Sequence, residues 1–111
     1  MTIFAKIISG DIPCNKVYED EHVLAFHDIA PRAKVHVLVI PKQTHLQGIQ
    51  DVSVTDAELM GHMMAKVPHI AALLGVDKSG YRVVTNNGPD SGQEVPHLHF
   101  HILGGERLKG L

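Results

Sequence analysis

Apolar residues in the first half of the chain recur with the spacing of one short helix and then of three strands. Phe4, Ile7 and Ile8 fall three and four residues apart, and Gly10 and Pro13 end that helical turn. The next three extended runs are residues 16–19, 23–27 and 36–40. The third run is apolar, rich in β-branched residues and followed by a proline, which is typical of a well-buried strand.

The second half of the chain predicts one long helix and two more strands. Residues 56–74 carry apolar side chains at helical spacing. Thr55 can cap this helix together with Glu58 in its first turn, and Gly75 can end it. Because Pro68 lies inside the segment, we expect it to kink the helix or to split it into two. The last two predicted strands are residues 81–85 and 97–103.

This order of elements predicts an α+β fold. Strands joined by short turns favour an antiparallel sheet, and the long helix has an apolar stripe with which to cover one face of it. The chain carries no internal repeat, low-complexity stretch or linker. Residues 1–111 are therefore predicted to form a single domain.

Composition and charge exclude several classes of protein. Apolar residues make up 44% of the chain and charged residues 20%, as in an ordinary globular domain. A formal charge of -2 without blocks of like charge argues against a nucleic-acid polymer as partner. Lys6 interrupts the first apolar run, so we expect neither a signal peptide nor a membrane span. Cys14 is the only cysteine, which fits a reducing compartment and predicts a cytoplasmic protein.

The most informative segment is the predicted strand at residues 97–103, His-Leu-His-Phe-His-Ile-Leu, in a chain with 9 histidines. Side chains alternate between the two faces of a strand. The three imidazoles are therefore predicted to share one face, at His97, His99 and His101. The three apolar side chains between them are predicted to pack into a core on the other face. Packing needs alone do not explain a face so rich in one titratable residue.

Two kinds of chemistry fit this row of histidines. A metal ion would bind one His-x-His pair and recruit other ligands such as His36, because His97 and His101 start ~13 Å apart along a strand. Alternatively, a neutral imidazole is a nucleophile that its neighbours can assist with protons. The preceding glycine-containing segment, residues 86–94, can present backbone N–H groups to phosphate oxygens. Spacing alone does not separate these two hypotheses.

Most of the chain resembles the histidine triad (HIT) family and, within it, the nucleotide-binding Hint branch. Residues 92–105 are similar to that branch's signature, in which H-x-H-x-H is followed by two apolar residues. Other segments resemble the family's N-terminal helix and central strands, namely residues 3–8 with 12–13, residues 25–29 and residues 36–42. The resemblance implies a HIT-like fold: a five-stranded antiparallel sheet with one long and one short helix, extended into a larger sheet across a homodimer.

The resemblance also implies an activity and the residues that carry it. The chain would be a purine nucleoside phosphoramidase or nucleotidyl hydrolase that binds an AMP or GMP moiety and needs no metal or other cofactor. His99 would attack the α-phosphorus and form a covalent nucleotidyl-histidine. His101 would bind phosphate oxygens and assist the leaving group, and the carbonyl of His97 would orient the ring of His99. His36 matches the fourth histidine of the family's active site.

Substrate-binding residues are assigned in the same way. Asp28 would hold the ribose hydroxyls. The residues assigned to the base pocket are Phe4, Ile7, Ile12, Phe26 and Ile29, with His27 as a further substrate contact. The phosphate and leaving-group contacts are assigned to Asn86, Gly92, Gln93, Glu94 and Val95.

The sequence departs from the family pattern at several positions and leaves other functions open. Glu94 stands where some eukaryotic members carry serine, and Pro96 stands where many carry an aromatic residue. Thr2 and Ala5 occupy the positions of a zinc-binding cysteine pair found in some bacterial members. Dinucleoside polyphosphate hydrolysis is an alternative activity, although Gln93 lies within a Hint-type Gly-Gln-Glu-Val pattern. A nucleotide-binding regulatory module with little turnover is the other alternative.

Overall fold

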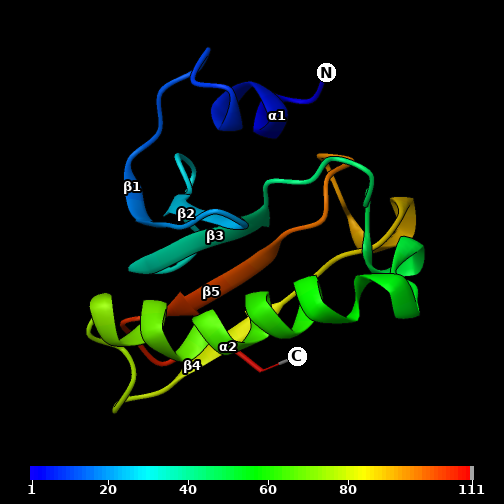
Figure 1. Cartoon of the computed structure of the whole chain (residues 1–111). Helices are drawn as coiled ribbons and strands as arrows, with labels where there is room; N and C mark the ends of the chain where they lie inside the picture. Colours follow the sequence, from blue (N-terminus) through cyan, green and yellow to red (C-terminus); the bar gives the residue numbers. More distant parts are fainter. Residues whose placement is uncertain (111) are drawn as a thin grey trace.

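A computed structural model describes residues 1–110 and contains one sheet with a helix on each of its two faces (Figure 1). Helix α1 spans Ile3–Ile8 and helix α2 spans Ala57–Leu73. The strands are β1 (Lys16–Glu19), β2 (Val23–His27), β3 (Val35–Pro41), β4 (Tyr81–Val84) and β5 (Phe100–Gly104). The α+β prediction is confirmed. Among the described residues, no helix combines the length and the hydropathy needed to cross a membrane.

The sheet is antiparallel throughout, with the strand order β1-β2-β3-β5-β4. The last strand therefore inserts between β3 and β4, and β3 and β5 lie side by side at the centre (Figure 1). Their register pairs Leu38 with His101 and His36 with Leu103. Because diagonal neighbours on one face are within reach of long side chains, this register brings the imidazoles of His36 and His101 together.

Side-chain alternation divides the interior into two apolar clusters. On one face of the sheet, residues such as Val37, Val39 and Ile102 are fully buried against Met63 and Ile70 of α2. On the opposite face, α1 places Phe4 over the side chains of Leu24, Phe26, Leu38 and Ile40. The short helix thus covers only the β2 and β3 part of its face. The β5 and β4 part of that face is left without a helix (Figure 1).

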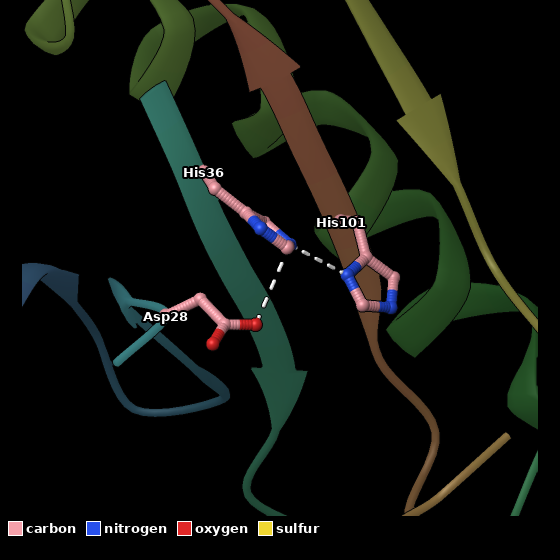
Figure 2. A group of neighbouring side chains, drawn as sticks. All are labelled: Asp28, His36 and His101. Carbon is pink, nitrogen blue, oxygen red and sulfur yellow. Dashed lines mark hydrogen bonds and ion pairs between the residues drawn. The ribbon is translucent and has the colours of Figure 1, made fainter. Parts of the chain in front are cut away.

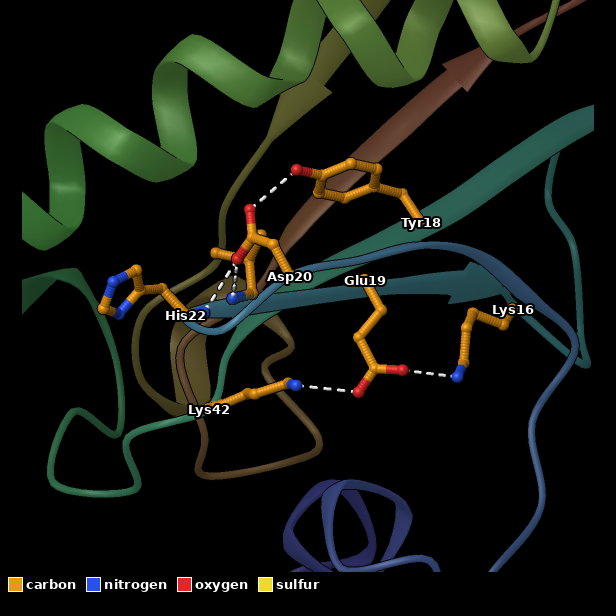
Figure 3. A network of polar contacts seen from close by, with 7 residues as sticks. Lys16, Tyr18, Glu19, Asp20, His22 and Lys42 are labelled. Carbon is orange, nitrogen blue, oxygen red and sulfur yellow. Dashed lines mark hydrogen bonds and ion pairs between the residues drawn. The ribbon is translucent and has the colours of Figure 1, made fainter.

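Polar contacts centred on Asp20 join the residues of the β1–β2 hairpin (Figure 3), and a further contact of Asp20 ties the hairpin to α2. Asp20 in the turn accepts hydrogen bonds from the backbone N–H groups of His22 and Val23 and from the hydroxyl of Tyr18 at 2.7 Å. Its carboxylate also lies 2.7 Å from Nε2 of His62 on α2. Burial alone would raise the pKa of Asp20, but these hydrogen bonds outweigh it and hold the pKa well below its usual range.

A second charged group fixes the outer edge of the sheet. The carboxylate of Glu19 pairs with the ammonium of Lys16 and, at 2.7 Å, with that of Lys42 beyond the end of β3 (Figure 3). The hydrogen bond from Lys16, followed by that from Lys42, lowers the pKa of Glu19 below its ordinary value. The edge strand β1 is thereby joined to the end of β3 by side chains as well as by its ladder with β2.

The long helix differs from the sequence-based expectation at two points. It continues through Pro68, so the predicted split is wrong. Pro68 lies on the exposed side of α2, where water can satisfy the carbonyl that loses its partner. The helix also starts directly after the 3-10 turn Val54–Asp56, so that Asp56, and not Thr55, is its N-cap residue. The side chain of Asp56 caps the 3-10 turn instead, where it accepts a hydrogen bond from the N–H of Ser53 at 3.0 Å. The predicted cap at Thr55 is therefore wrong.

The histidine segment is only partly a strand. The strand β5 begins at Phe100 and not at the predicted residue 97. Continuing the register would set Leu98 opposite Pro41, which has no N–H to donate. The N–H of Leu98 donates instead to the carbonyl of Leu46, at 2.9 Å. The alternation of faces nevertheless persists, because Leu98, Phe100 and Ile102 all belong to the cluster under α2.

Candidate active site

A pocket of about 120 Å³ lies beside α1, over the central strands and under the loop that precedes β5. Its lining includes three of the four histidines singled out from the sequence, His36, His99 and His101. The other lining residues are Phe4, Asp28, Ala30, Arg32, Leu38, Asn86, Gly92, Gln93, Glu94 and Val95. Ten of these thirteen residues come from the sequence-based assignment, drawn from five separate segments.

The ring of His99 is held in one tautomer. Its Nδ1 lies 2.6 Å from the carbonyl oxygen of His97, and a carbonyl can only accept. The proton of the neutral ring is therefore on Nδ1, and Nε2 keeps its lone pair. The ring of Phe4 packs edge-on at 5.1 Å between centroids, and His99 is only 6% exposed. The result is a nucleophilic nitrogen on a ring that the backbone and α1 orient.

The neighbouring imidazoles of His36 and His101 lie side by side (Figure 2), and a second backbone group orients them. The N–H of Arg32 donates to Nδ1 of His36 at 3.0 Å, so the proton of neutral His36 is on Nε2. This Nε2–H donates to Nδ1 of His101 at 2.9 Å. The proton of neutral His101 is therefore on its own Nε2, on the ring edge away from His36 (Figure 2). A hydrogen-bond donor thus stands 4.9 Å, between ring centroids, from the nucleophilic ring of His99.

Burial keeps the imidazoles of His36 and His101 neutral near pH 7. It lowers the pKa of His101 to about 4, and the nearby rings of His99 and His36 add to the shift. It also lowers the pKa of His36, against the opposing effect of the Asp28 carboxylate. The tautomers that the hydrogen bonds assign to His36 and His101 are therefore those present at neutral pH.

The imidazole of His97 does not face this pocket. It is 1% exposed, and its Nε2–H donates to the carbonyl of Pro41 at 2.9 Å. Burial lowers the pKa of this ring as well. The contribution of His97 to the pocket is its backbone carbonyl, which orients His99, and its buried side chain locks the segment before β5 to the end of β3.

Asp28, His36 and His101 place ligand-type atoms within 4.8 Å of one another, a spacing that a metal ion needs (Figure 2). The hydrogen bonds do not fit that use. A metal on Nε2 of His36 would require the ring proton on Nδ1, where it would point at the N–H of Arg32. The carboxylate of Asp28 lies 3.4 Å from Nε2 of His36 and accepts from the N–H of Ala30 at 2.8 Å. Asp28, His36 and His101 are therefore arranged to hold a proton between them and not a metal ion.

The loop over the pocket is held by Gln93. Its side-chain oxygen accepts from the N–H of Gly88, and its amide group donates to the carbonyls of Gln47 and Val95. Both the oxygen and the amino group of this side-chain amide thus form hydrogen bonds within the protein. Gly88 and Gly92 have φ of 82° and 85°, which residues with a side chain rarely adopt. Gln93 therefore shapes the loop, since its side-chain amide is engaged within the protein and its backbone N–H donates to the carbonyl of Gly88 at 3.4 Å.

Comparison with known proteins identifies the family. Residues 9–108 match the family described as HIT domain. The chain belongs to the HIT family. It is 50% identical over 107 residues to an uncharacterized HIT-like protein of Helicobacter pylori, covering 96% of this chain and 99% of that protein.

Solved structures of the HIT family share the fold. A HIT family hydrolase from Legionella pneumophila has a TM-score of 0.94 and 40% identity, covering 98% of this chain and 96% of its own. A HIT family hydrolase from Clostridium thermocellum has a TM-score of 0.94 and 38% identity, covering 99% and 95% respectively. The HIT-like prediction for the fold is therefore confirmed.

Several residues assigned to substrate in this HIT protein lie outside the pocket lining. Phe26 is 4% exposed and packs beneath Phe4, at 5.7 Å between ring centroids. Ile29 is 98% exposed beside the pocket. The remaining ones, Ile7, Ile12 and His27, are half-buried.

Three lining residues were missed from the sequence of the HIT protein: Ala30, Arg32 and Leu38. Leu38 follows His36 by two positions on the same predicted strand. Because side chains two positions apart share a face, the sequence was sufficient to place Leu38 beside His36. Ala30 and Arg32 lie in an irregular turn after Asp28, where no periodic pattern applies.

Proposed function

We propose that this HIT protein hydrolyses purine nucleoside phosphoramidates at the α-phosphorus through a nucleotidyl-histidine at His99. The proposal rests on the opposite tautomers of His99 and His101, which line the same pocket. His99 offers a lone pair at Nε2, and His101 offers an N–H at Nε2. Nucleophilic displacement at phosphorus with protonation of the leaving group needs this combination.

The first step forms the bond between Nε2 of His99 and phosphorus and breaks the bond from phosphorus to the leaving nitrogen. An anionic phosphate beside His101 favours uptake of one proton by the His36–His101 pair. The carboxylate of Asp28, 3.4 Å from Nε2 of His36, stabilises that charge. His101 then delivers the proton from Nε2 to the leaving nitrogen, which departs as a neutral amine. The positive charge moves to the nucleotidylated ring of His99.

The second step is hydrolysis of that intermediate. Water adds to phosphorus, the bond from phosphorus to Nε2 of His99 breaks, and His101 accepts the proton that water loses. The nucleoside monophosphate leaves with its new oxygen, and His99 returns to the neutral Nδ1–H tautomer. The carbonyl of His97 holds that proton throughout. No metal ion is needed in either step, because the nucleophile is a side chain.

An assay panel tests the proposed function. Protein dialysed against EDTA is expected to release AMP from adenosine phosphoramidates with a kcat/KM at least about tenfold above that for dinucleoside polyphosphates. Faster cleavage of the polyphosphates would assign the alternative hydrolase activity. Activity that requires added zinc would contradict the mechanism, and tight AMP binding without turnover of any substrate would favour the regulatory module.

Asp28 is proposed to bind the ribose. Each of its two oxygens has one partner in the protein and retains a lone pair for a hydroxyl. Asp28→Ala is expected to weaken AMP binding about 10- to 100-fold, because charge-assisted hydrogen bonds contribute about 1.5–3 kcal/mol. Binding of deoxy-AMP is expected to weaken less. Calorimetry measures both; Asp77→Ala, in an exposed turn, is the control. If the ratio of the affinities for AMP and deoxy-AMP is the same in native protein and in Asp28→Ala, the role of Asp28 is only that of a turn residue.

We further propose that the protein is a homodimer. The outward face of α2 is exposed and largely apolar, with Gly61, Met64, Ala65, Pro68 and Ala72 along it. The edge strand β4 adds Val83, 38% exposed, and unpaired backbone groups for a second sheet. Sedimentation at micromolar concentration is expected to give a dimer. Met64→Glu is expected to give monomers, while Val54→Glu, at a 90% exposed site before α2, is not. A monomeric native protein would refute the proposal.

The remaining expectation concerns location. The cytoplasmic location stays a prediction that rests on the single cysteine, Cys14, which is half-buried and free.

A further inference from the structure

A second, larger pocket opens beside the candidate active site. It has a volume of about 460 Å³ and shares Arg32, His36, Asn86 and His101 with the first pocket. Its floor is the part of the sheet face that α1 leaves uncovered, where Arg82 and Val84 of β4 lie beside Leu103 and His101 of β5. The two pockets are therefore consecutive compartments of one surface, with His101 between them.

The charge of this second pocket is opposite to that of the whole chain. Arg32, Arg82, Arg107 and Lys109 line it, four of the chain's 10 basic residues, although the formal net charge is -2. We call this set the basic groove. Of the chain's 12 acidic residues, Glu106 is the one present among the described lining residues. Four cationic groups around one cavity create a local positive potential that attracts anions.

Internal contacts neutralise little of that charge. The carboxylate of Glu106 accepts a hydrogen bond from the backbone N–H of Lys34 at 2.7 Å. The guanidinium of Arg82 donates to the carbonyl of Lys109 at 2.8 Å, which holds the C-terminal segment over the groove and leaves the charge in place. Arg32 lies 3.8 Å from Glu94, but both side chains are more than three-quarters exposed, so the pair is weak.

The chemistry of the proposed reaction assigns a place to the leaving group. A nucleophile and a leaving group stand roughly in line on opposite sides of the phosphorus. His99 lines the first pocket and is not among the residues that line the basic groove, whereas His101 lines both. A leaving group opposite His99 and within reach of the proton on His101 therefore extends into the basic groove.

We propose that the basic groove binds the leaving group of the substrate and selects amines that carry a carboxylate or a phosphate group. This inference rests on the proposed phosphoramidase function. The groove supplies the charge complementarity, and the shared wall at His101 supplies the connection to the reacting atoms.

Matched pairs of adenosine phosphoramidates test this selectivity. One pair has β-alanine or its neutral amide as leaving group, and the other has 2-aminoethyl phosphate or ethanolamine. The anionic member of each pair is expected to show at least about a tenfold higher kcat/KM at low salt, with the advantage shrinking as salt screens the groove. A preference in only one pair would identify carboxylate or phosphate as the recognised group. Equal values in both pairs, or a preference for the neutral members, would overturn the proposal.

Variants of the groove provide the second readout. Arg107→Gln with Lys109→Gln is expected to bring the anionic-to-neutral ratio close to one. The matched pair Lys6→Gln with Lys78→Gln, at exposed positions outside the groove, is expected to keep the native ratio. A double groove variant with the native ratio would contradict the assignment.

A binding measurement separates failure of this inference from failure of the proposed function. The same substrate pairs are titrated by calorimetry into His99→Ala protein, which lacks the nucleophile. If no phosphoramidate is turned over by native protein, yet the anionic members bind at least about tenfold more tightly, the phosphoramidase function fails and the groove keeps its selectivity for anions. Equal binding of the anionic and neutral members refutes that selectivity.

Discussion

Replacement of His99 by alanine is expected to lower turnover of an adenosine phosphoramidate by at least about three orders of magnitude. The covalent step has no other nucleophile of the right tautomer, because the Nδ1 of His101 is already used by His36 and its Nε2 carries a proton. AMP binding is expected to change by less than about threefold, because the loop and Asp28 remain in place. Turnover measured with excess substrate and calorimetry with AMP separate the two effects.

The intermediate itself is the sharper readout. Native protein quenched rapidly in base during turnover is expected to carry the added mass of one nucleotidyl group on the peptide that contains His99. His69→Ala, at an exposed position on α2, serves as the control and is expected to retain both label and turnover. Label on another peptide, or a His99→Ala protein with most of its activity, would disprove the assigned nucleophile.

Much of the fold was accessible from the sequence because its periodicities are simple. The predicted strands β1 and β2 have the bounds that the structure shows, and those of β3 and β4 differ by one residue at most at either end. Alternation also predicted that Leu98 and Phe100 pack away from the imidazoles, and both lie in the cluster under α2. These predictions depend on local backbone geometry, which repeats along the chain.

The parts that were not predictable depend on contacts between distant segments. The three histidines of the triad have different roles because the ring of His97 reaches Pro41, 56 positions away, while the rings of His99 and His101 meet other partners. The tautomer of His36 follows from a backbone N–H at Arg32 in an irregular turn. The sequence assigned Gln93 to substrate binding. In the structure its side chain forms hydrogen bonds with the backbone of Gly88, Gln47 and Val95.

Removal of the His101 side chain is expected to have an effect that depends on the leaving group. An alkylamine departs only after its nitrogen gains a proton, so His101→Ala is expected to lower turnover of an alkyl phosphoramidate about 10²- to 10⁴-fold, as for loss of a general acid. The 4-nitrophenyl ester of AMP releases an anion that needs no proton, and its turnover is expected to fall about tenfold or less. Equal losses with the two substrates would show that His101 acts only in binding phosphate.

The charge state of His101 provides an independent measurement of the same role. Because burial holds its pKa at about 4, the ring is expected to titrate near that pH by NMR in the unliganded protein and to be neutral at pH 7. A bound phosphate anion stabilises the cation, so AMP is expected to raise the pH at which the ring titrates. If AMP does not change the pH midpoint of the His101 titration, binding of the nucleotide does not protonate His101, and the proposed source of the proton for the leaving amine is wrong.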